Sequence, residues 1–271
     1  MKIAGRTLVT VYLCLALPAV SWAQALKPET QRDFDCYIQS AEARMEAAKP
    51  FLLADSDSAL DERLVRGQQI PTIPGNGPDP HKIAAGLVYD WVGLVFIPGG
   101  TLDRTIRMLQ DYDHRTQYFP EILSASKLLC RAGDNRFRFS MRLKEPIVAD
   151  VESEVVWERL DAHRWRCRSY SMSVKEIPKE RGYVLRLVSY WRFSETDKGT
   201  YVQAETITLS REFGGFTRAL GSMMGLSPEK SLRHTLASMR ESLLKPGLQF
   251  ASPPAGAAAC GEAFQPGGCA K

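Results

Sequence analysis

RFRFSMRL, residues 136–143, decides the fold, because polar and apolar side chains alternate along it. Successive side chains of a β-strand point to opposite faces, so this alternation places four apolar side chains on one face. They are Phe137, Phe139, Met141 and Leu143. The opposite face carries three arginines and Ser140. The stretch therefore predicts a β-strand with one buried face.

Similar stretches lie on both sides of this one and are separated by turn signals such as Ala-Gly-Asp at 132–134 and Asp-Lys-Gly at 197–199. The further stretches are 122–131, 148–158, 164–177, 183–193 and 200–209. Six consecutive strands with short connections predict an antiparallel meander.

The flanking segments predict helices and one more long strand. A helix is expected over 28–49, a strand over 63–70, a proline-rich loop over 71–80, a strand over 82–97 and a helix from Thr101 towards Tyr112. After a glycine-rich connector, Ser227-Pro228-Glu229 starts a last helix that Pro246-Gly247 ends. Its apolar stripe is Leu232, Leu236, Met239 and Leu243.

A sheet with one apolar face needs a cover, and this striped helix can supply it. The fold class is therefore α+β, with an antiparallel sheet covered by a long C-terminal helix and an extra N-terminal helix. The expected division is a helical extension at 24–62, one domain at 63–247 and an Ala-, Gly- and Pro-rich tail at 248–271, which is expected to be disordered.

Residues 1–23 are typical of a cleavable signal peptide. Lys2 and Arg6 precede a short apolar stretch, and Ser21-Trp22-Ala23 places small residues at the cleavage positions. The apolar stretch is shorter than the roughly 20 residues of a membrane span. We expect cleavage after Ala23 and a periplasmic or secreted protein. The mature chain is near neutral, which argues against a nucleic-acid partner.

Five cysteines remain after cleavage, so one thiol stays unpaired in an oxidising compartment. Cys260 and Cys269 could close a small loop, and Cys36 is expected to be the odd thiol. Cys130 and Cys167 fall in predicted strands. There they could form disulfides or stay as buried free thiols. Their spacing fits no metal site, and we expect neither a metal nor another cofactor.

The order of elements over residues 83–244 resembles the START-like (SRPBCC) superfamily of helix-grip domains. The resemblance lies in 102–122, where a helix leads to Asp111-Tyr112 and then to Pro120 before the next strand. It implies a curved antiparallel sheet wrapped around the C-terminal helix, with an apolar cavity between them that binds a hydrophobic small molecule or lipid. The N-terminal helix and the proline-rich loop depart from the family pattern.

The residues expected to contact such a ligand come from the sheet, the connector and the last helix. They are Trp191, Glu205, Phe213, Phe216, Met223, Met224, Leu232, Leu236 and Met239. The connector 213–226 could act as a gate, with transient membrane contact, or pack as a plain loop. Glu205 could point inward and pair with Arg192 or Arg168, or lie outward in a solvated ion pair.

Two other functions stay open. An enzyme of the cyclase or aromatase kind could use Asp111, Tyr112, Asp113 and His114 as acid and base, although such a cluster at a helix end is more often surface. A structural or interaction protein would fill the cavity with its own side chains. We prefer ligand binding without catalysis.

Overall fold

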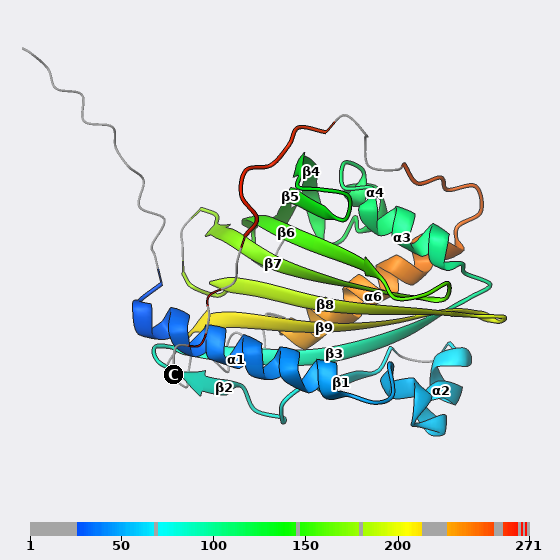
Figure 1. Cartoon of the computed structure of the whole chain (residues 1–271), viewed down its shortest axis with the longest axis horizontal. Helices are drawn as coiled ribbons and strands as arrows, with labels where there is room; N and C mark the ends of the chain where they lie inside the picture. The colour runs from blue at the N-terminus through cyan, green and yellow to red at the C-terminus, as the bar shows by residue number, and fades with distance from the viewer. Residues whose placement is uncertain are drawn as a thin grey trace, which may run out of the picture.

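The computed structural model of the chain describes residues 26–67, 70–144, 147–178, 181–212, 227–251, 257–264, 267 and 269. The six predicted strands are present, and each pairs antiparallel with the next. They are β4 (Leu123–Arg131), β5 (Arg136–Leu143), β6 (Ala149–Arg159), β7 (Arg164–Glu176), β8 (Arg186–Thr196) and β9 (Gly199–Arg211). The predicted meander is confirmed as the main part of a large, curved, open sheet (Figure 1).

The long strand predicted near residues 82–97 extends this sheet. β3 (Gly86–Pro98) pairs along its whole length with β9. Two short strands, β1 (Thr72–Pro74) and β2 (His81–Ile83), pair with β3. β1 corrects the prediction of a loop throughout 71–80. An edge strand forms ladder hydrogen bonds on one side only, so it tolerates proline.

The last helix, α6 (Pro228–Leu244), crosses one face of the sheet, called here the inner face, and lies behind the sheet in Figure 1. Its predicted stripe is buried in the largest apolar core. α6 lies close to Gly93 of β3, where an added Cβ would lie 2.6 Å from Leu236 Cδ1. α3 (Leu102–Gln110) and α4 (Arg115–Tyr118) contribute side chains to the same core.

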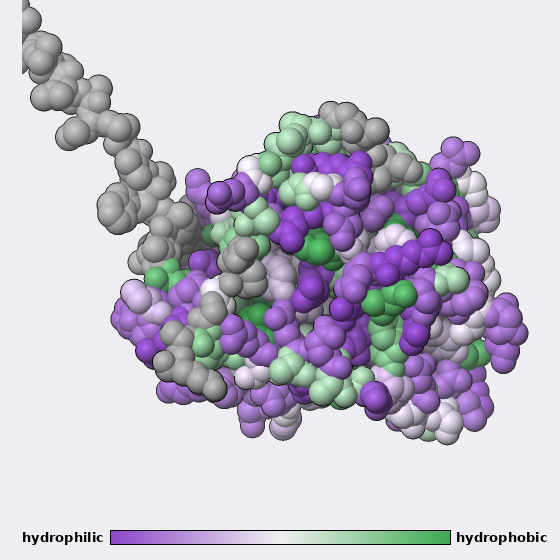
Figure 2. Space-filling view, in the orientation of Figure 1, coloured by the Kyte–Doolittle hydropathy of each residue, from purple (hydrophilic) through white to green (hydrophobic). Residues whose placement is uncertain are grey.

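The first helix, α1 (Pro28–Ala47), crosses the opposite face, called here the outer face, and lies in front of the sheet in Figure 1. Phe34, Tyr37, Ile38 and Ala41 pack against a second apolar core with side chains of β3, β7, β8 and β9. The solvent-facing surface on this side is mostly hydrophilic (Figure 2). Two helices from opposite ends of the chain therefore cover the two faces of the sheet.

A helix stands where part of a strand was predicted. α2 (Ser58–Val65) follows the short turn η1 (Leu53–Asp55), whereas the sequence predicted a strand over 63–70. The Asp57 side chain accepts a hydrogen bond from Leu60 N (3.0 Å) and so caps the helix. Leu60 and Leu64 lie one turn apart and pack against the outer face of β3. This cap and the i, i+4 pair account for the helix.

No helix within the described ranges is long and apolar enough to span a membrane.

The cysteine pairing differs from the prediction. Cys36 is bonded to Cys269, and Cys130 is bonded to Cys260, while Cys167 is a buried free thiol. The predictions of an unpaired Cys36 and of a Cys260–Cys269 loop were therefore wrong.

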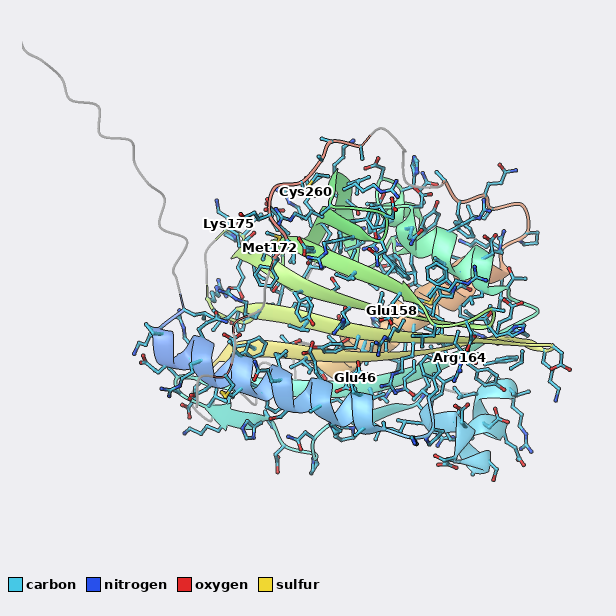
Figure 3. All side chains as sticks on the ribbon, viewed as in Figure 1. Glu46, Glu158, Arg164, Met172, Lys175 and Cys260 are labelled. Carbon is cyan, nitrogen blue, oxygen red and sulfur yellow. A yellow bond between two sulfur atoms is a disulfide. The ribbon has the colours of Figure 1, made fainter. Side chains whose placement is uncertain are left out.

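The reason lies in the C-terminal segment, for which the sequence predicted disorder. Residues 257–264 lie along the sheet, with Ala259 bridged to Arg131 and Phe264 packed against Tyr170. Cys260 thereby reaches the strand end that carries Cys130, and its position is marked in Figure 3.

These pairings predict a defined disulfide map. Proteolysis of the non-reduced protein followed by mass spectrometry should yield one peptide pair joined through Cys36 and Cys269 and another joined through Cys130 and Cys260. Cys167 should react with a bulky maleimide only in denaturant, because it is buried and burial raises the pKa of its thiol. A peptide joining Cys260 to Cys269, or rapid labelling of Cys167 in native buffer, would contradict the structure.

Candidate functional site

A cavity of about 1040 Å³ lies between the inner face of the sheet and α6. It is lined from β3, from β5 to β9 and from α6 between Pro228 and Glu241. Leu109 of α3, Arg115 of α4 and the segments around Pro78 and Phe119 complete the lining. Ligand sites in proteins typically measure about 300–1,000 Å³, so this space suits an extended small molecule or a lipid tail.

The floor of the cavity contains a row of hydroxyl groups. Strand pairing sets five inward-facing residues side by side across the sheet: Val155, Ser169, Ser189, Thr206 and Trp91. Ser169, Ser189 and Thr206 keep part of their surface exposed although they lie in the middle of the sheet. Trp191 Nε1 donates a hydrogen bond to Ser189 Oγ (3.1 Å). The row gives the floor polar contacts without charge.

The adjacent cross-strand row is apolar. It consists of Trp157, Cys167, Trp191, Ala204 and Gly93. The small residues Ala204 and Gly93 leave room for α6, while Trp157, Cys167 and Trp191 line the cavity. One row farther along, Phe193 and Val202 belong to the fully buried core. α6 therefore seals one half of the inner face and leaves the cavity over the other half.

Arg115 of α4 brings a positive charge to this apolar wall. Its guanidinium lies 4.4 Å from the ring centre of Phe139 and 4.6 Å from that of Tyr112. Nη2 donates to Leu109 O (2.5 Å), and Nε is buried without a hydrogen-bond partner. Burial lowers the pKa of Arg115 from its ordinary value, although the group remains an arginine cation at neutral pH. The sequence interpretation did not single out this residue.

The residues predicted to contact ligand fall into separate places. Trp191 and Leu232 line the cavity. Leu236 and Met239 are fully buried in the core where α6 meets the sheet. The connector residues Phe213, Phe216, Met223 and Met224 lie outside the described residues, and their role as a gate stays a prediction.

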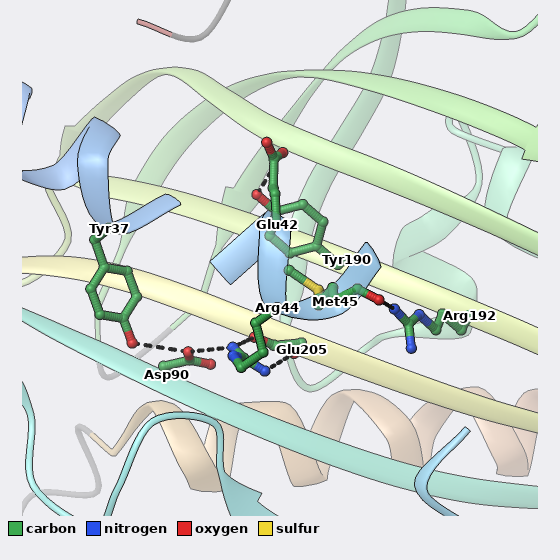
Figure 4. Close-up of polar contacts among 8 residues, drawn as sticks. All are labelled: Tyr37, Glu42, Arg44, Met45, Asp90, Tyr190, Arg192 and Glu205. Carbon is green, nitrogen blue, oxygen red and sulfur yellow. Dashed lines mark hydrogen bonds and ion pairs between the residues drawn. The ribbon is translucent and has the colours of Figure 1, made fainter. Parts of the chain in front are cut away.

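Glu205 lies on the outer face, beneath α1, and not on the face of the cavity (Figure 4). Arg44 of α1 donates to Glu205 Oε1 (2.5 Å) and to Asp90 Oδ2 (3.2 Å). Tyr37 also donates to Asp90 Oδ2 (2.9 Å). The structure thus differs from both predicted positions of Glu205, because its face is covered by α1 and its partner comes from that helix. Arg192, a predicted partner, instead donates to the carbonyl oxygens of Met45 and Phe51.

Polar contacts continue along the whole of α1. Glu42 accepts hydrogen bonds from the hydroxyls of Tyr170 and Tyr190. Farther along, Arg166 contacts both Glu46 of α1 and Glu158 of β6, at 2.7 Å each. Glu46 and Glu158 are marked in Figure 3 at this end of the helix. These contacts fix α1 on the sheet and serve the fold, with the cavity on the other side.

Asp90 is a carboxylate of this network whose pKa is strongly raised. Burial, together with the nearby charge of Glu205, raises the pKa of its carboxyl to about 7, against the lowering effects of Tyr37 and Arg44. Its Oδ1 atom is buried without a hydrogen-bond partner. A protonated Asp90 can donate to Glu205, which favours the neutral form.

This change in pKa predicts how stability depends on pH. Between about pH 4 and pH 7 the folded chain retains a proton on Asp90 that the unfolded chain releases, so stability falls as the pH rises through this window. The side chain introduced by Asp90→Asn cannot ionise, so the variant should not show this part of the fall in stability. Urea unfolding at pH 5 and pH 8 measures it, and a decline in the variant equal to that of the parent protein would contradict the prediction.

The acid–base group predicted at Asp111–His114 is occupied by structural contacts. Asp111 accepts hydrogen bonds from the Tyr118 hydroxyl and Ala251 N, and His114 Nδ1 lies 2.7 Å from it. The Tyr112 hydroxyl accepts from Trp157 Nε1 (3.0 Å). Asp113 accepts from Leu128 N (2.9 Å). The group connects the end of α3 to β4 and β6, and none of its members is among the residues that line the cavity.

The buried positions of Arg44 and Asp90 could have been predicted from the sequence, whereas the position of Arg115 could not. Arg44 continues the helical spacing of Phe34, Ile38 and Ala41, so its position on the buried face was visible. Asp90 interrupts an apolar strand, which signals a buried carboxylate. Arg115 stands in a charged stretch that is typical of a surface, and only the fold places it against the cavity.

No family model matches the chain, and no curated protein matches it. Solved structures are similar to it. A STAR-related lipid transfer protein from Xanthomonas axonopodis is 14% identical, with a TM-score of 0.46 over 66% of this chain and 100% of that chain. The Zhui aromatase/cyclase from Streptomyces sp. R1128 is 11% identical, with a TM-score of 0.46 over 58% of this chain and 93% of that chain. Human STARD10 is 13% identical, with a TM-score of 0.40 over 69% of this chain and 80% of that chain.

The chain's own architecture carries the conclusion on its fold. A long strand and two helices precede a six-stranded antiparallel meander, and a C-terminal helix packs across the inner face of the curved sheet. The cavity lies between that helix and the sheet. The chain therefore has a helix-grip fold, as the sequence predicted.

Proposed function

We propose that this protein binds a hydrophobic small molecule or a lipid in the cavity between the sheet and α6. The observation that carries the proposal is the volume of about 1040 Å³ in the interior of the domain, with aromatic and aliphatic side chains over much of its wall. Burial of apolar ligand surface there contributes roughly 25 cal/mol per Å² before the costs of association. A protein with a merely structural role would gain more by filling this space with its own side chains.

Ligand binding is preferred to catalysis by a cyclase or aromatase. That alternative relied on Asp111, Tyr112, Asp113 and His114, whose side chains bond to one another and to neighbouring elements and are not among the residues that line the cavity. A carboxylate held by three hydrogen-bonding partners is poorly placed to exchange protons with a substrate.

The experiment is to purify the protein without detergent and to measure its mass under native and denaturing conditions. A hydrophobic compound should appear as an added mass in the native spectrum and be recovered by solvent extraction. The stripped protein should then bind 1-aminoanthracene, a neutral fluorescent probe. Absence of a co-purifying compound together with absence of probe binding would count against the proposal.

We also propose that the protein is exported to the periplasm or secreted, with residues 1–23 removed. The targeting pattern of those residues supports this, and so do two disulfides, which are typical of oxidising compartments. Mass spectrometry of the protein from the periplasm or medium should find Gln24 as the first residue. Recovery of the full-length chain with Met1 from the cytoplasm would contradict it.

A further inference from the structure

Arg115 lines the cavity and has no carboxylate within 4.0 Å among the described residues, although the charge of Asp111 acts on it from farther away. Arg44 has two carboxylates, and Arg136 and Arg138 share Glu154 at 3.1 and 2.8 Å. The rings of Tyr112 and Phe139 flank its guanidinium. The cavity wall also contains apolar side chains such as Leu109, Phe119 and Trp157, and its charged residues include Glu121, Lys144 and Glu241.

The contacts of Arg115 engage only some of the N–H groups of its guanidinium. The rings of Tyr112 and Phe139 contact the plane of the group, and Leu109 O accepts from Nη2. These contacts fix the orientation of the side chain and leave Nε buried without an acceptor. An unpaired buried donor on a charged group is costly, so such a group is expected to be held for an acceptor that arrives from outside the chain.

We propose that Arg115 binds the anionic end of an amphiphilic ligand, a carboxylate or a phosphate attached to an apolar chain. Guanidinium binds these oxyanions through paired N–H groups, and here the group is held rigidly by its two rings. The hydroxyl row of Ser169, Ser189 and Thr206 supplies uncharged polar contacts elsewhere on the floor. This assignment rests on the proposed function and narrows it to a class of ligand.

The test compares three ligands with the same chain at pH 8: hexadecanoate, hexadecyl phosphate and hexadecanol. The affinity of each ligand is measured by its displacement of 1-aminoanthracene from the stripped protein. Because this probe is neutral, its own binding shows whether the cavity is intact. The variants are Arg115→Met, which keeps the length of the side chain, and Arg115→Lys, which keeps the charge. Arg107→Met is the matched control, because Arg107 is an exposed arginine of α3 paired with Asp103. Near-ultraviolet circular dichroism checks the fold of each variant.

The parent protein should bind at least one of the two anions at least about tenfold more tightly than the alcohol. Arg115→Met should lose this preference and still bind the alcohol and the probe, whereas Arg107→Met should keep it. Preference for only one anion identifies the headgroup as carboxylate or as phosphate.

Equal binding of acids and alcohol by the parent protein, or an unchanged preference in Arg115→Met, would overturn the assignment and leave the proposed function intact. Failure of all three ligands and the probe to bind would overturn the proposed function as well. Should Arg115→Met not fold, the parent protein and Arg115→Lys still decide the question. Arg115→Lys keeps the charge but cannot form the paired contact, so the preference should weaken, and an unaltered preference would show that the anion does not use the paired N–H groups of Arg115.

Discussion

Arg44→Met should lower the free energy of unfolding by about 3 kcal/mol at pH 8. The Asp90 and Glu205 side chains are only 3% and 5% exposed, and Arg44 is their shared counter-charge. Its removal leaves two carboxylates buried side by side under α1. The cost lies at the lower end of the range for a broken buried pair, because the Arg44 side chain is itself 42% exposed. Urea unfolding measures it, and the melting temperature should fall by roughly 6–12 °C.

The pH dependence separates this effect from a simple loss of packing. At pH 5 Asp90 is protonated, since its pKa is raised to about 7, so Arg44→Met should cost less there than at pH 8. Adding Asp90→Asn and Glu205→Gln to Arg44→Met should recover much of the stability, because no uncompensated charge remains. Arg32→Met on the same helix removes an exposed pair and should cost less than about 1 kcal/mol. Equal costs for Arg44→Met and Arg32→Met at pH 8 would show that the buried network does not stabilise the fold.

The sheet was predictable from sequence because alternation along a strand is a local property. RFRFSMRL and its neighbours alternate within single strands, so their number, their order and their antiparallel pairing followed directly. Which face of each strand lies toward α6 is not local. One face of β9 includes apolar residues, as the cavity face does. It carries Tyr201, Gln203, Glu205, Ile207 and Leu209. Only the position of α1 shows that this set lies on the outer face.

The disulfides and the site were less predictable, because they depend on segments far apart in the sequence. Cys36 and Cys269 are separated by 233 residues, and Cys130 and Cys260 by 130. A composition rich in Ala, Gly and Pro predicts a free tail, yet the backbone of 257–264 bonds to β4 and to Glu154. Trp191 and Leu232 could be proposed from patterns, whereas the place of Arg115 required the packing of α4 against β5.

Filling the cavity floor should abolish binding without unfolding the protein. In the double variant Ser169→Phe, Thr206→Trp, two large rings replace small side chains that flank Ser189 on the inner face and have exposed surface in the cavity. Aromatic residues suit strands, and neither replaced hydroxyl has a hydrogen-bond partner within the described chain, so stability should change by less than about 1 kcal/mol. Affinity for 1-aminoanthracene and for any co-purifying lipid should fall at least about tenfold, because the rings occupy the apolar volume.

The location of the new rings, and not their hydrophobicity, must account for the loss. Ser173→Phe provides the control, because Ser173 lies on the same strand β7 and is exposed at the surface, so binding should be unchanged. The bond from Trp191 to Ser189 is kept in the double variant, which leaves that wall of the cavity in place. Parent-like affinity in the double variant would mean that the ligand binds outside the space between the sheet and α6. Loss of binding in Ser173→Phe as well would point to a general disturbance of β7.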